Sequence, residues 1–227
     1  MALVESNPIF QIKGRVGRYV IKKFNGKRVI SLRPVHYKKT KSRVALKLQS
    51  NFVAVICFAK HINSIQNLVS IWNTSSIKGF SAYHKIIKSN LKITKFGELT
   101  AQNIIVPDSI PSLITDIQLN KNELMVSINN LTTLKSIVGN HAATLVTVFV
   151  YSSSKRKTKS SLHISSMLHH LKIEDCPGDF QKCFFISNEQ PKMGNRIRHL
   201  ILFSTLIWKS SASNKYEWCS TYSKIIK

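Results

Sequence analysis

The clearest pattern along the chain is a pair of β-prone runs on either side of the dipeptide Asn25-Gly26. The runs are Tyr19–Phe24 and Lys27–Leu32. Asn-Gly supplies the two residues with positive φ that a type I′ turn needs, so we expect a two-residue β-hairpin. In that register Phe24 is paired with Lys27, and the pairs continue outward until Arg18 is paired with Arg33.

Directly paired residues share a face, so this register divides the hairpin into two surfaces. One surface, which we expect to be buried, carries Tyr19, Ile21, Ile30 and Leu32, with Lys23 and Arg28 at its tip. The opposite surface carries Arg18, Val20, Lys22, Phe24, Lys27, Val29 and Arg33. The pairs Arg18–Arg33 and Lys23–Arg28 set like charges opposite each other, which is destabilising unless an anion lies between them or the side chains splay into solvent.

Beyond Pro34 the apolar positions recur at three- and four-residue steps, which is typical of helices. We expect a long helix capped by Thr40 or Ser42, with a break or bend near residues 63–64, and a shorter helix that follows Gly79 and ends about Asn90. Helical spacing favours packing in a core over stacking on bases for four aromatic residues. They are Phe52, Trp72, Phe80 and Tyr83.

After Pro107 the pattern changes to β-prone runs separated by polar turns. The runs cover residues 114–119, 123–128, 143–151, 161–165, 180–186, 197–208 and 216–223. They predict an antiparallel β-sandwich of about seven strands, immunoglobulin-like or fibronectin-like. The expected fold class is therefore α+β. We divide it into a basic hairpin-plus-helix module over residues 1–97 and a β-sandwich-like domain over residues 98–227.

The charge of the chain is large and unevenly distributed. The sequence has 34 Lys and Arg against 10 Asp and Glu, a formal net charge of +24. Between Glu5 and Glu98 there are 19 basic residues and no acidic one. An AT-rich genome favours Lys, Asn, Ile and Ser throughout a chain, but it does not readily explain why acids are missing from one part only. This excess of basic residues has two interpretations, which are a surface that binds a polyanion and compositional drift.

The basic residues of the hairpin and of the segment after it are the candidate contacts to phosphates. They are Arg15, Arg18, Lys22, Lys23, Lys27, Arg28, Arg33, Lys38, Lys39, Lys41, Arg43 and Lys47. They predict a non-enzymatic protein that binds nucleic acid, either DNA or RNA. The alternative is a structural component of a larger assembly, a phage particle or a bacterial multiprotein machine, in which the hairpin docks on an acidic protein partner. Binding to anionic membranes is a weaker option, because the long helix has its charges near its start.

No pattern supports catalysis, a metal or another cofactor. Gly14-x-x-Gly17 precedes a strand instead of opening a helix, so it is not a dinucleotide fingerprint. The metal-capable residues His163, His169, His170, Cys176 and Cys183 lack the spacing of a structural zinc site. The clustered acids Glu174, Asp175 and Asp179 lie in a predicted turn, and nothing supports their use in acid–base chemistry. We therefore predict no catalytic residues, no metal and no cofactor.

The cysteines and the apolar runs bear on the cellular compartment. The four cysteines are scattered, so free thiols in a reducing compartment are the simplest interpretation, while a Cys176–Cys183 pair stays open. The first residues lack the continuous apolar region of a signal peptide, and no apolar run reaches the ~18 residues of a membrane span. We expect a cytoplasmic protein, or one within a particle assembled in the cytoplasm.

The N-terminal segment combines Gly14-Arg-Val-Gly17, the turn Asn25-Gly26-Lys27 and the step Arg33-Pro34. This combination resembles the start of an uncharacterised bacterial family, catalogued only as a domain of unknown function. It is also similar to N-terminal patterns in small proteins of phages and mobile elements. The resemblance is strongest over residues 14–90.

The resemblance implies a helix with Gln49 and Phe52, an aromatic-containing helix that ends at Asn90, and a β-rich C-terminal part. The usual proline-threonine step before the long helix is replaced here by Lys38-Lys-Thr40. The resemblance therefore implies an architecture, but it carries no activity.

Overall fold

The computed structural model describes residues 2–3, 14–24, 26–33, 42–120, 123–129, 142–153, 161–172, 180–185, 197–210 and 215–226. The chain divides into two compact units, Met1–Ser42 and Arg43–Lys227. The sequence predicts a division between residues 97 and 98. The structural division falls earlier because the helices after residue 42 share an apolar core with the C-terminal strands.

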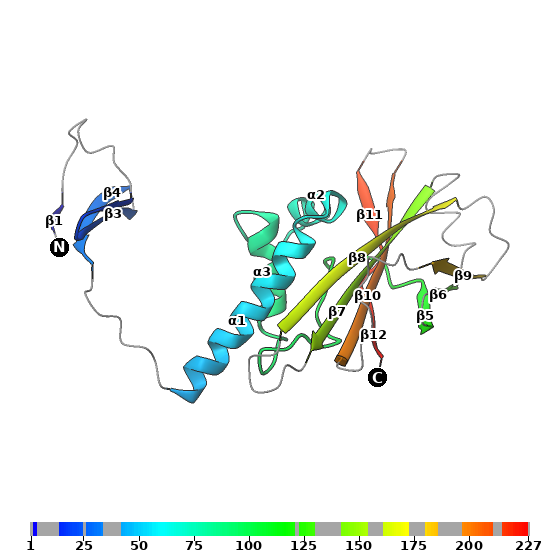
Figure 1. The fold of residues 1–227 in the computed structure, drawn as a ribbon. Helices are drawn as coiled ribbons and strands as arrows, with labels where there is room; N and C mark the ends of the chain where they lie inside the picture. Colours follow the sequence, from blue (N-terminus) through cyan, green and yellow to red (C-terminus); the bar gives the residue numbers. More distant parts are fainter. Residues whose placement is uncertain are drawn as a thin grey trace. The chain divides into compact units, whose positions relative to one another are not determined.

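The first unit contains a four-stranded antiparallel sheet in the order β1-β4-β3-β2 (Figure 1). Its strands are β1 (Ala2–Leu3), β2 (Gly14–Val16), β3 (Tyr19–Phe24) and β4 (Lys27–Leu32). The predicted register of the hairpin is confirmed from the pair Phe24–Lys27 to the pair Tyr19–Leu32. Gly26 has a φ of 78°, in the left-handed region that the tight turn requires.

The second unit begins with three helices: α1 (Arg43–Ile62), α2 (Gln66–Thr74) and α3 (Ala82–Leu91). The predicted break in the long helix is confirmed, because α1 ends before residue 63 and α2 begins after residue 65. Among the described helices, no single one is long and apolar enough to cross a membrane. By length and composition, α1 and α2 meet that test only together, across a bend of 108°.

Two antiparallel sheets follow the helices. The central sheet has the order β11-β10-β7-β8, and β12 also pairs with β10. Its strands are β7 (Ala142–Ser153), β8 (Ser161–Lys172), β10 (Ile197–Lys209), β11 (Tyr216–Trp218) and β12 (Tyr222–Ile226). The smaller sheet, in the order β5-β6-β9, comprises β5 (Ile114–Asn120), β6 (Glu123–Ile128) and β9 (Phe180–Phe185). The run predicted over residues 161–165 extends to residue 172, and the one predicted over residues 216–223 is two short strands.

Two apolar clusters lie on opposite faces of the central sheet, because successive residues of a strand point to opposite faces. Leu145 of β7 and Leu202 of β10 pack with buried residues of β5 and β6. Val146 of β7 and Phe203 of β10 pack instead with the helices. The second unit therefore has three layers, with the helices on one side of the central sheet and the smaller sheet on the other (Figure 1).

The described residues confirm an α+β fold with antiparallel sheets and an N-terminal hairpin. They do not confirm a sandwich of immunoglobulin type. In a two-sheet sandwich each sheet buries one face, whereas here the central sheet buries both of its faces.

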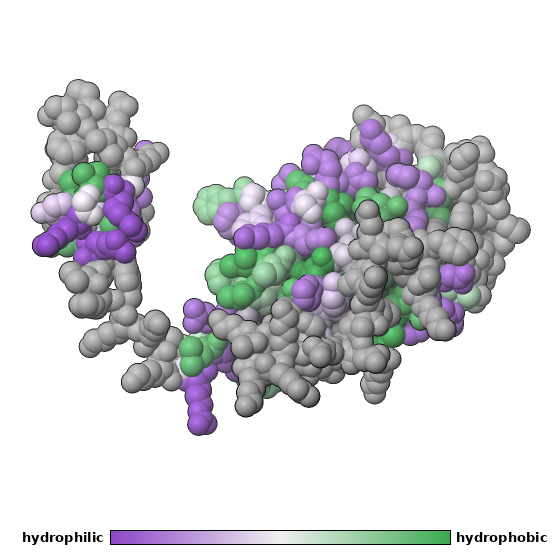
Figure 2. All heavy atoms as spheres, in the orientation of Figure 1, coloured by the Kyte–Doolittle hydropathy of each residue, from purple (hydrophilic) through white to green (hydrophobic). Residues whose placement is uncertain are grey.

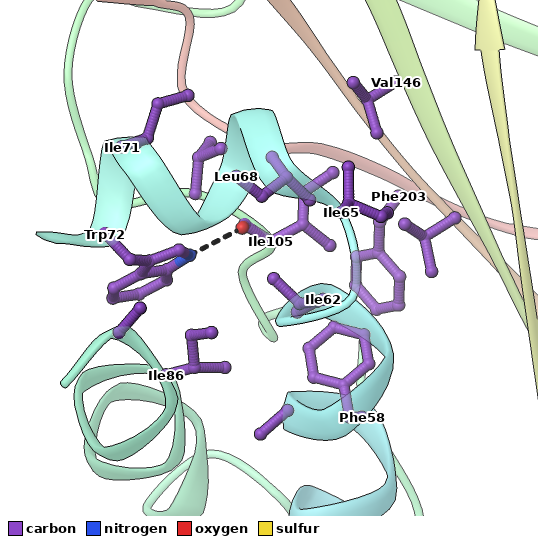
Figure 3. Packing of buried hydrophobic residues seen from close by; sticks show 14 of the residues in the cluster. Phe58, Ile62, Ile65, Leu68, Ile71, Trp72, Ile86, Ile105, Val146 and Phe203 are labelled. Atoms are coloured by element: carbon purple, nitrogen blue, oxygen red, sulfur yellow. Dashed lines mark hydrogen bonds between the residues drawn. The ribbon is translucent and has the colours of Figure 1, made fainter. Parts of the chain in front are cut away.

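The helical core centres on Trp72, which is fully buried (Figure 3). The indole Nε1–H of Trp72 donates to the carbonyl of Ile105 at 2.9 Å, so its polar atom is satisfied. Phe58 of α1 packs against Phe203 of β10, with ring centroids 5.5 Å apart. These contacts join the helices to the central sheet and to the segment that follows α3.

The prediction that four aromatic residues pack in the core is right for two of them. Trp72 is buried, and Tyr83 packs at the edge of the helical cluster. The prediction is wrong for Phe80 and Phe52, because Phe80 is fully exposed and Phe52 is 45% exposed. Phe80 precedes α3, so the helical repeat does not apply to it. Phe52 lies on α1 beside the buried stripe, not within it.

A buried amide fixes the segment after α3 to the helix. Asn90 is fully buried, and its Nδ2 donates to the carbonyls of Ile86 at 3.1 Å and Ile104 at 3.0 Å. Its Oδ1 accepts from the backbone N–H of Ile104 at 2.8 Å and from Nδ2 of Asn103 at 3.0 Å. Both polar atoms of the Asn90 side chain are satisfied by protein groups, so this amide links α3 to the segment without an unpaired buried polar group.

Candidate nucleic-acid interface

The small sheet of the first unit places several predicted phosphate contacts on one face. Arg15 pairs with Val20, Lys22 with Val29, and Lys27 with Phe24. Paired residues share a face, and so do residues two apart on a strand, which puts these three cations on the same side. Arg18 lies in the turn between β2 and β3, and Arg33 directly follows β4, so both lie at the end of the hairpin opposite residues 25–26. There the N–H of Arg33 donates to the carbonyl of Arg18 at 2.8 Å. We call this surface the cationic face (Arg15, Arg18, Lys22, Lys27 and Arg33).

All five residues of the cationic face are exposed. No described carboxylate forms an ion pair with them; the ion pair between described residues joins Lys224 to Asp116, in the second unit. Like charges therefore lie close together without an opposing charge in the described part of the chain. Each cation would gain electrostatic energy from an anion placed over this surface.

The opposite face of the sheet is apolar, and our expectation that it is buried is wrong for its outer residues. Val16 is 47% exposed, Tyr19 52% and Leu32 67%, whereas Ile21 and Ile30 are partly buried. The described residues of the first unit form a single layer, so no second layer within that unit covers this side. Figure 2 shows apolar residues (green) beside hydrophilic ones (purple) over the described part of this sheet. We call this surface the apolar face (Val16, Tyr19, Ile21, Ile30 and Leu32).

The remaining predicted contacts do not join the cationic face. Lys23 is exposed on the side of the apolar face, and the side chain of Arg28 lies outside the described residues, as do Lys38, Lys39 and Lys41. Arg43 and Lys47 are exposed on the first turns of α1, in the second unit. The ammonium of Lys47 lies 3.9 Å from the ring centroid of Phe96, a cation–π contact. The structure thus brings together five of the twelve predicted residues.

One basic residue of the acid-free stretch has a structural role that sequence reasoning missed. Lys85 of α3 is only 8% exposed, and its Nζ donates to the carbonyls of Asn73 at 3.0 Å and Ser75 at 2.8 Å. These carbonyls lie at the C-terminal end of α2, which carries the negative pole of the helix dipole. Gly79 lets the Lys85 side chain pass, since a Cβ at residue 79 would lie 2.9 Å from Cγ of Lys85.

The sequence did hold a signal for this role. Ala82, Lys85, Ile86 and Asn90 recur at three- and four-residue steps, so Lys85 falls on the buried stripe of its helix. A lysine on such a stripe needs oxygen partners for its ammonium group, because an unpaired buried charge is unfavourable. Lys85 is therefore a structural residue and is not available to a phosphate.

The residues considered for a metal site or for catalysis do not form a cluster among the described residues. His163 stacks on Tyr151, with ring centroids 5.1 Å apart, and Nδ1 of His170 lies 3.2 Å from Oγ1 of Thr144. The acids at residues 174, 175 and 179 and the cysteine at residue 176 lie outside the described residues, as does the side chain of Cys183.

The side chains of two cysteines are described, and both are free thiols. Cys57 is exposed, whereas Cys219 is fully buried. Burial raises the pKa of the Cys219 thiol to about 11, because a thiolate is poorly solvated there. Cys219 is therefore protonated at neutral pH and is a packing residue, not a nucleophile.

No family model, no curated protein and no solved structure matches this chain. The resemblance of the N-terminal motifs to an uncharacterised bacterial family therefore stays a prediction, and the following proposal rests on the chain's own residues.

Proposed function

We propose that this protein binds nucleic acid, without catalysing a reaction, through the cationic face of the β2–β4 sheet. The observation that carries the proposal is that Arg15, Lys22 and Lys27 are exposed on one side of a sheet whose described residues include no acid, with Arg18 and Arg33 exposed at its end. A polyanion placed there would relieve the repulsion between neighbouring cations and would release its own condensed counterions.

The dimensions of the sheet fit a phosphate backbone. Residues two apart on a strand are ~6.8 Å apart and neighbouring strands ~4.8 Å, so the cationic face from Arg33 to Lys27 is ~20 Å long. Each strand of a DNA duplex carries one charge per ~3.4 Å along the axis, so ~20 Å covers several phosphates. Lys and Arg contacts to phosphates position a protein without reading bases, so we expect affinity that depends little on sequence.

Salt dependence tests this proposal directly. If about five phosphates are contacted, the slope of log K against log salt should be about −4.5 for duplex DNA and about −3.5 for single strands. Fluorescence polarisation with labelled duplex and single-stranded oligonucleotides, between about 50 and 200 mM salt, measures both slopes. A slope near zero would remove electrostatic binding of nucleic acid as the function.

Substitution of the cationic face tests the location of the site. The variant Arg18→Gln, Lys22→Gln, Lys27→Gln, Arg33→Gln should lose about 3.6 from the slope, since each contact contributes about 0.9. A matched control is Lys60→Gln, Lys78→Gln, Lys92→Gln, Lys95→Gln, which removes the same charge from four exposed lysines of the second unit. The control should keep most of the slope. Equal losses in the two variants would show that net charge, not the sheet, sets the affinity.

A second candidate is a structural role in a larger assembly, which the exposed apolar face favours. Tyr19 and Leu32 are more than half exposed, and a protein partner with apolar residues and acidic flanks could cover them while pairing with Lys23, which is exposed on the same side. Purification with and without nuclease separates the two functions. Nuclease-sensitive material with high absorbance at 260 nm supports nucleic-acid binding, and a stoichiometric protein that survives nuclease supports the assembly.

Three finer assignments are proposals of the same kind. The protein is cytoplasmic, or lies within a particle assembled there. It belongs with the bacterial family that its N-terminal motifs resemble. Its two C-terminal sheets correspond to an immunoglobulin-like or fibronectin-like sandwich whose central sheet is covered by the helices on its other face, which is supported by the apolar cluster that β5 and β6 share with the central sheet. An experimentally determined structure tests the last assignment through the order of the strands.

A further inference from the structure

The N-terminal end of α1 carries an apolar surface that the core of the second unit does not cover. No residue of α1 before Asn51 is buried, so about two turns of the helix, ~12 Å, project beyond the core (Figure 1). Val44 is 68% exposed, Leu46 48%, Leu48 63% and Val53 55%. Figure 2 shows apolar residues (green) beside hydrophilic ones (purple) at this end. We call this surface the α1 tip (Val44, Leu46, Leu48 and Val53).

The apolar residues of the α1 tip lie on two opposite sides of the helix. Val44 and Leu48 precede Val55 by eleven and seven residues, close to whole numbers of turns, so they continue the stripe that is buried further along α1. Leu46 and Val53 precede Val55 by nine and two residues, which places them on the other side. A groove on a protein covers one side of a helix, whereas a bilayer surrounds an inserted helix end. Exposure on both sides therefore favours a bilayer.

A turn after α3 holds the ring of Phe96 beside this end of the helix. Oδ1 of Asn51 accepts from the N–H of Gly97 at 2.6 Å, and the ammonium of Lys47 lies 3.9 Å from the ring centroid of Phe96. Phe96 is 73% exposed and has a φ of 54°, which is uncommon for a bulky residue. Burial in the core does not explain a strained turn that presents its ring to solvent, whereas insertion of the ring at a membrane boundary would explain it.

The charges around the α1 tip favour an anionic surface. Arg43 and Lys47 on α1 and Lys95 in the turn are exposed, and residues 42–97 include no acid. The first acid, Glu98, directly follows the turn. In the sequence, charges confined to the start of the helix count against a membrane. In the structure that start is also the exposed part of α1, so cations and exposed apolar residues coincide.

We propose that the α1 tip, together with Phe96, inserts into the interfacial region of an anionic lipid bilayer. Amphipathic helices at membrane surfaces bury their apolar residues roughly 5–10 Å into the boundary between headgroups and acyl chains, within the ~12 Å by which α1 projects. The exposed cations beside the tip would pair with lipid phosphates. This site is separate from the cationic face, and the proposal does not rest on nucleic-acid binding.

Vesicle flotation with the full chain tests the proposal. The probes are vesicles of phosphatidylcholine and vesicles that also contain phosphatidylglycerol, and the native protein should bind the anionic ones more tightly. The variant Val44→Gln, Leu48→Gln, Val53→Gln keeps every charge. It should bind anionic vesicles about a hundredfold more weakly, since burial of each half-exposed aliphatic side chain contributes about fivefold. Native protein that does not bind anionic vesicles would overturn the proposal.

A matched control removes three exposed apolar side chains from other parts of the second unit. It is Phe80→Gln, Leu168→Gln, Ile225→Gln, and it should bind anionic vesicles as the native protein does. Equal losses in the two variants would mean that exposed apolar residues anywhere on the unit hold the vesicle, and they would overturn the assignment to the α1 tip.

Tryptophan at residue 96 distinguishes insertion from attraction by charge alone. Relative to the native protein, Phe96→Trp should show emission that shifts to shorter wavelength with anionic vesicles and is quenched by brominated lipid. Vesicle-bound protein with unchanged emission would overturn insertion. Binding of an acidic amphipathic peptide to the α1 tip, without a shift on vesicles, would instead assign this surface to a protein partner and overturn the proposal.

Discussion

The hairpin of the first unit and the helical segment of the second are equally free of acidic residues, yet they use their cations differently. In residues 43–97, Lys85 caps the end of α2, Lys88 donates to the carbonyl of Lys78 at 3.3 Å, and Lys47 lies over the ring of Phe96. The five residues of the cationic face make no such side-chain contact with described residues. A basic segment without acidic residues therefore does not by itself imply an external anion, because carbonyls at helix ends and aromatic rings also interact with cations.

Amide hydrogen exchange offers the largest contrast between the two regions. Where the structure describes the burial of residues of the first unit, none is fully buried, whereas β7 and β10 are buried along most of their length. Because sparsely buried elements open at low free energy, we expect peptides from residues 14–33 to exchange orders of magnitude faster than those of β7. Mass spectrometry on the full chain measures both. Addition of nucleic acid should slow exchange in the first unit only. Equal exchange rates in residues 14–33 and in β7 without nucleic acid would contradict the expected difference between the two regions.

The buried amide of Asn90 gives the largest expected effect of a single substitution. Asn90→Ala removes one hydrogen-bond partner each from the N–H of Ile104, the carbonyl of Ile104 and the side-chain amide of Asn103 inside the core. We expect a loss of about 3 kcal/mol in the free energy of unfolding, since several buried groups become unsatisfied together. Denaturant unfolding checks the value, with the exposed Asn63→Ala as control. A loss under about 1 kcal/mol would mean that water replaces the amide.

Nucleic-acid affinity of the folded Asn90→Ala protein should equal that of the native chain. The substitution lies in the second unit and removes no charge, so it separates the stability of the helical region from the binding that we propose for the sheet. A drop in affinity of the folded variant would instead place part of the interface on the second unit.

Part of this architecture could be predicted from the sequence, because local rules determine it. The Asn-Gly dipeptide set the register of the hairpin, and with it the residues that share the cationic face. Three- and four-residue steps predicted the helices and their break. The exposure of Tyr19 and Leu32 could not be predicted, since alternation shows which residues share a face but not whether another layer covers it.

The division of the chain was also beyond local rules. Residues 43–97 look like an extension of the basic hairpin in composition, yet their apolar stripe packs on Val146 and Phe203, about a hundred residues later in the chain. Such long-range packing is specified by the shape of the whole core, which one stretch of sequence does not reveal. Composition grouped these residues with the hairpin, whereas packing groups them with the sheet.

The substitution Lys85→Met should cause a loss of stability of intermediate size. Methionine keeps the aliphatic stem but removes the ammonium group that bonds the carbonyls of Asn73 and Ser75. We expect a loss of about 2 kcal/mol, the range for a charged hydrogen bond at a partly buried helix end. Thermal unfolding checks it, with the exposed Lys92→Met as control. If the free energy of nucleic-acid binding falls by more than the free energy of unfolding in Lys85→Met, Lys85 belongs to the interface and is not a structural residue of the second unit.

The smallest effect concerns a cation whose partner is a carboxylate. The hydrogen bond from Lys224 lowers the pKa of Asp116 below its usual value of 3.8. A carboxyl whose folded pKa is depressed adds stability above its unfolded pKa, and that stability is lost as the pH falls through the folded value. Both side chains are 36% exposed, so Asp116→Asn should cost no more than about 1 kcal/mol at neutral pH.

The difference in stability between the native protein and Asp116→Asn should disappear in acid, once the pH is below the folded pKa of Asp116. The cost of Lys85→Met should persist there, because the partners of Lys85 are backbone carbonyl groups, which do not titrate. Melting temperatures of the three proteins at neutral and acidic pH give both comparisons. A cost of Lys85→Met that vanished in acid would mean that a carboxylate, and not the end of α2, is the partner that holds this lysine.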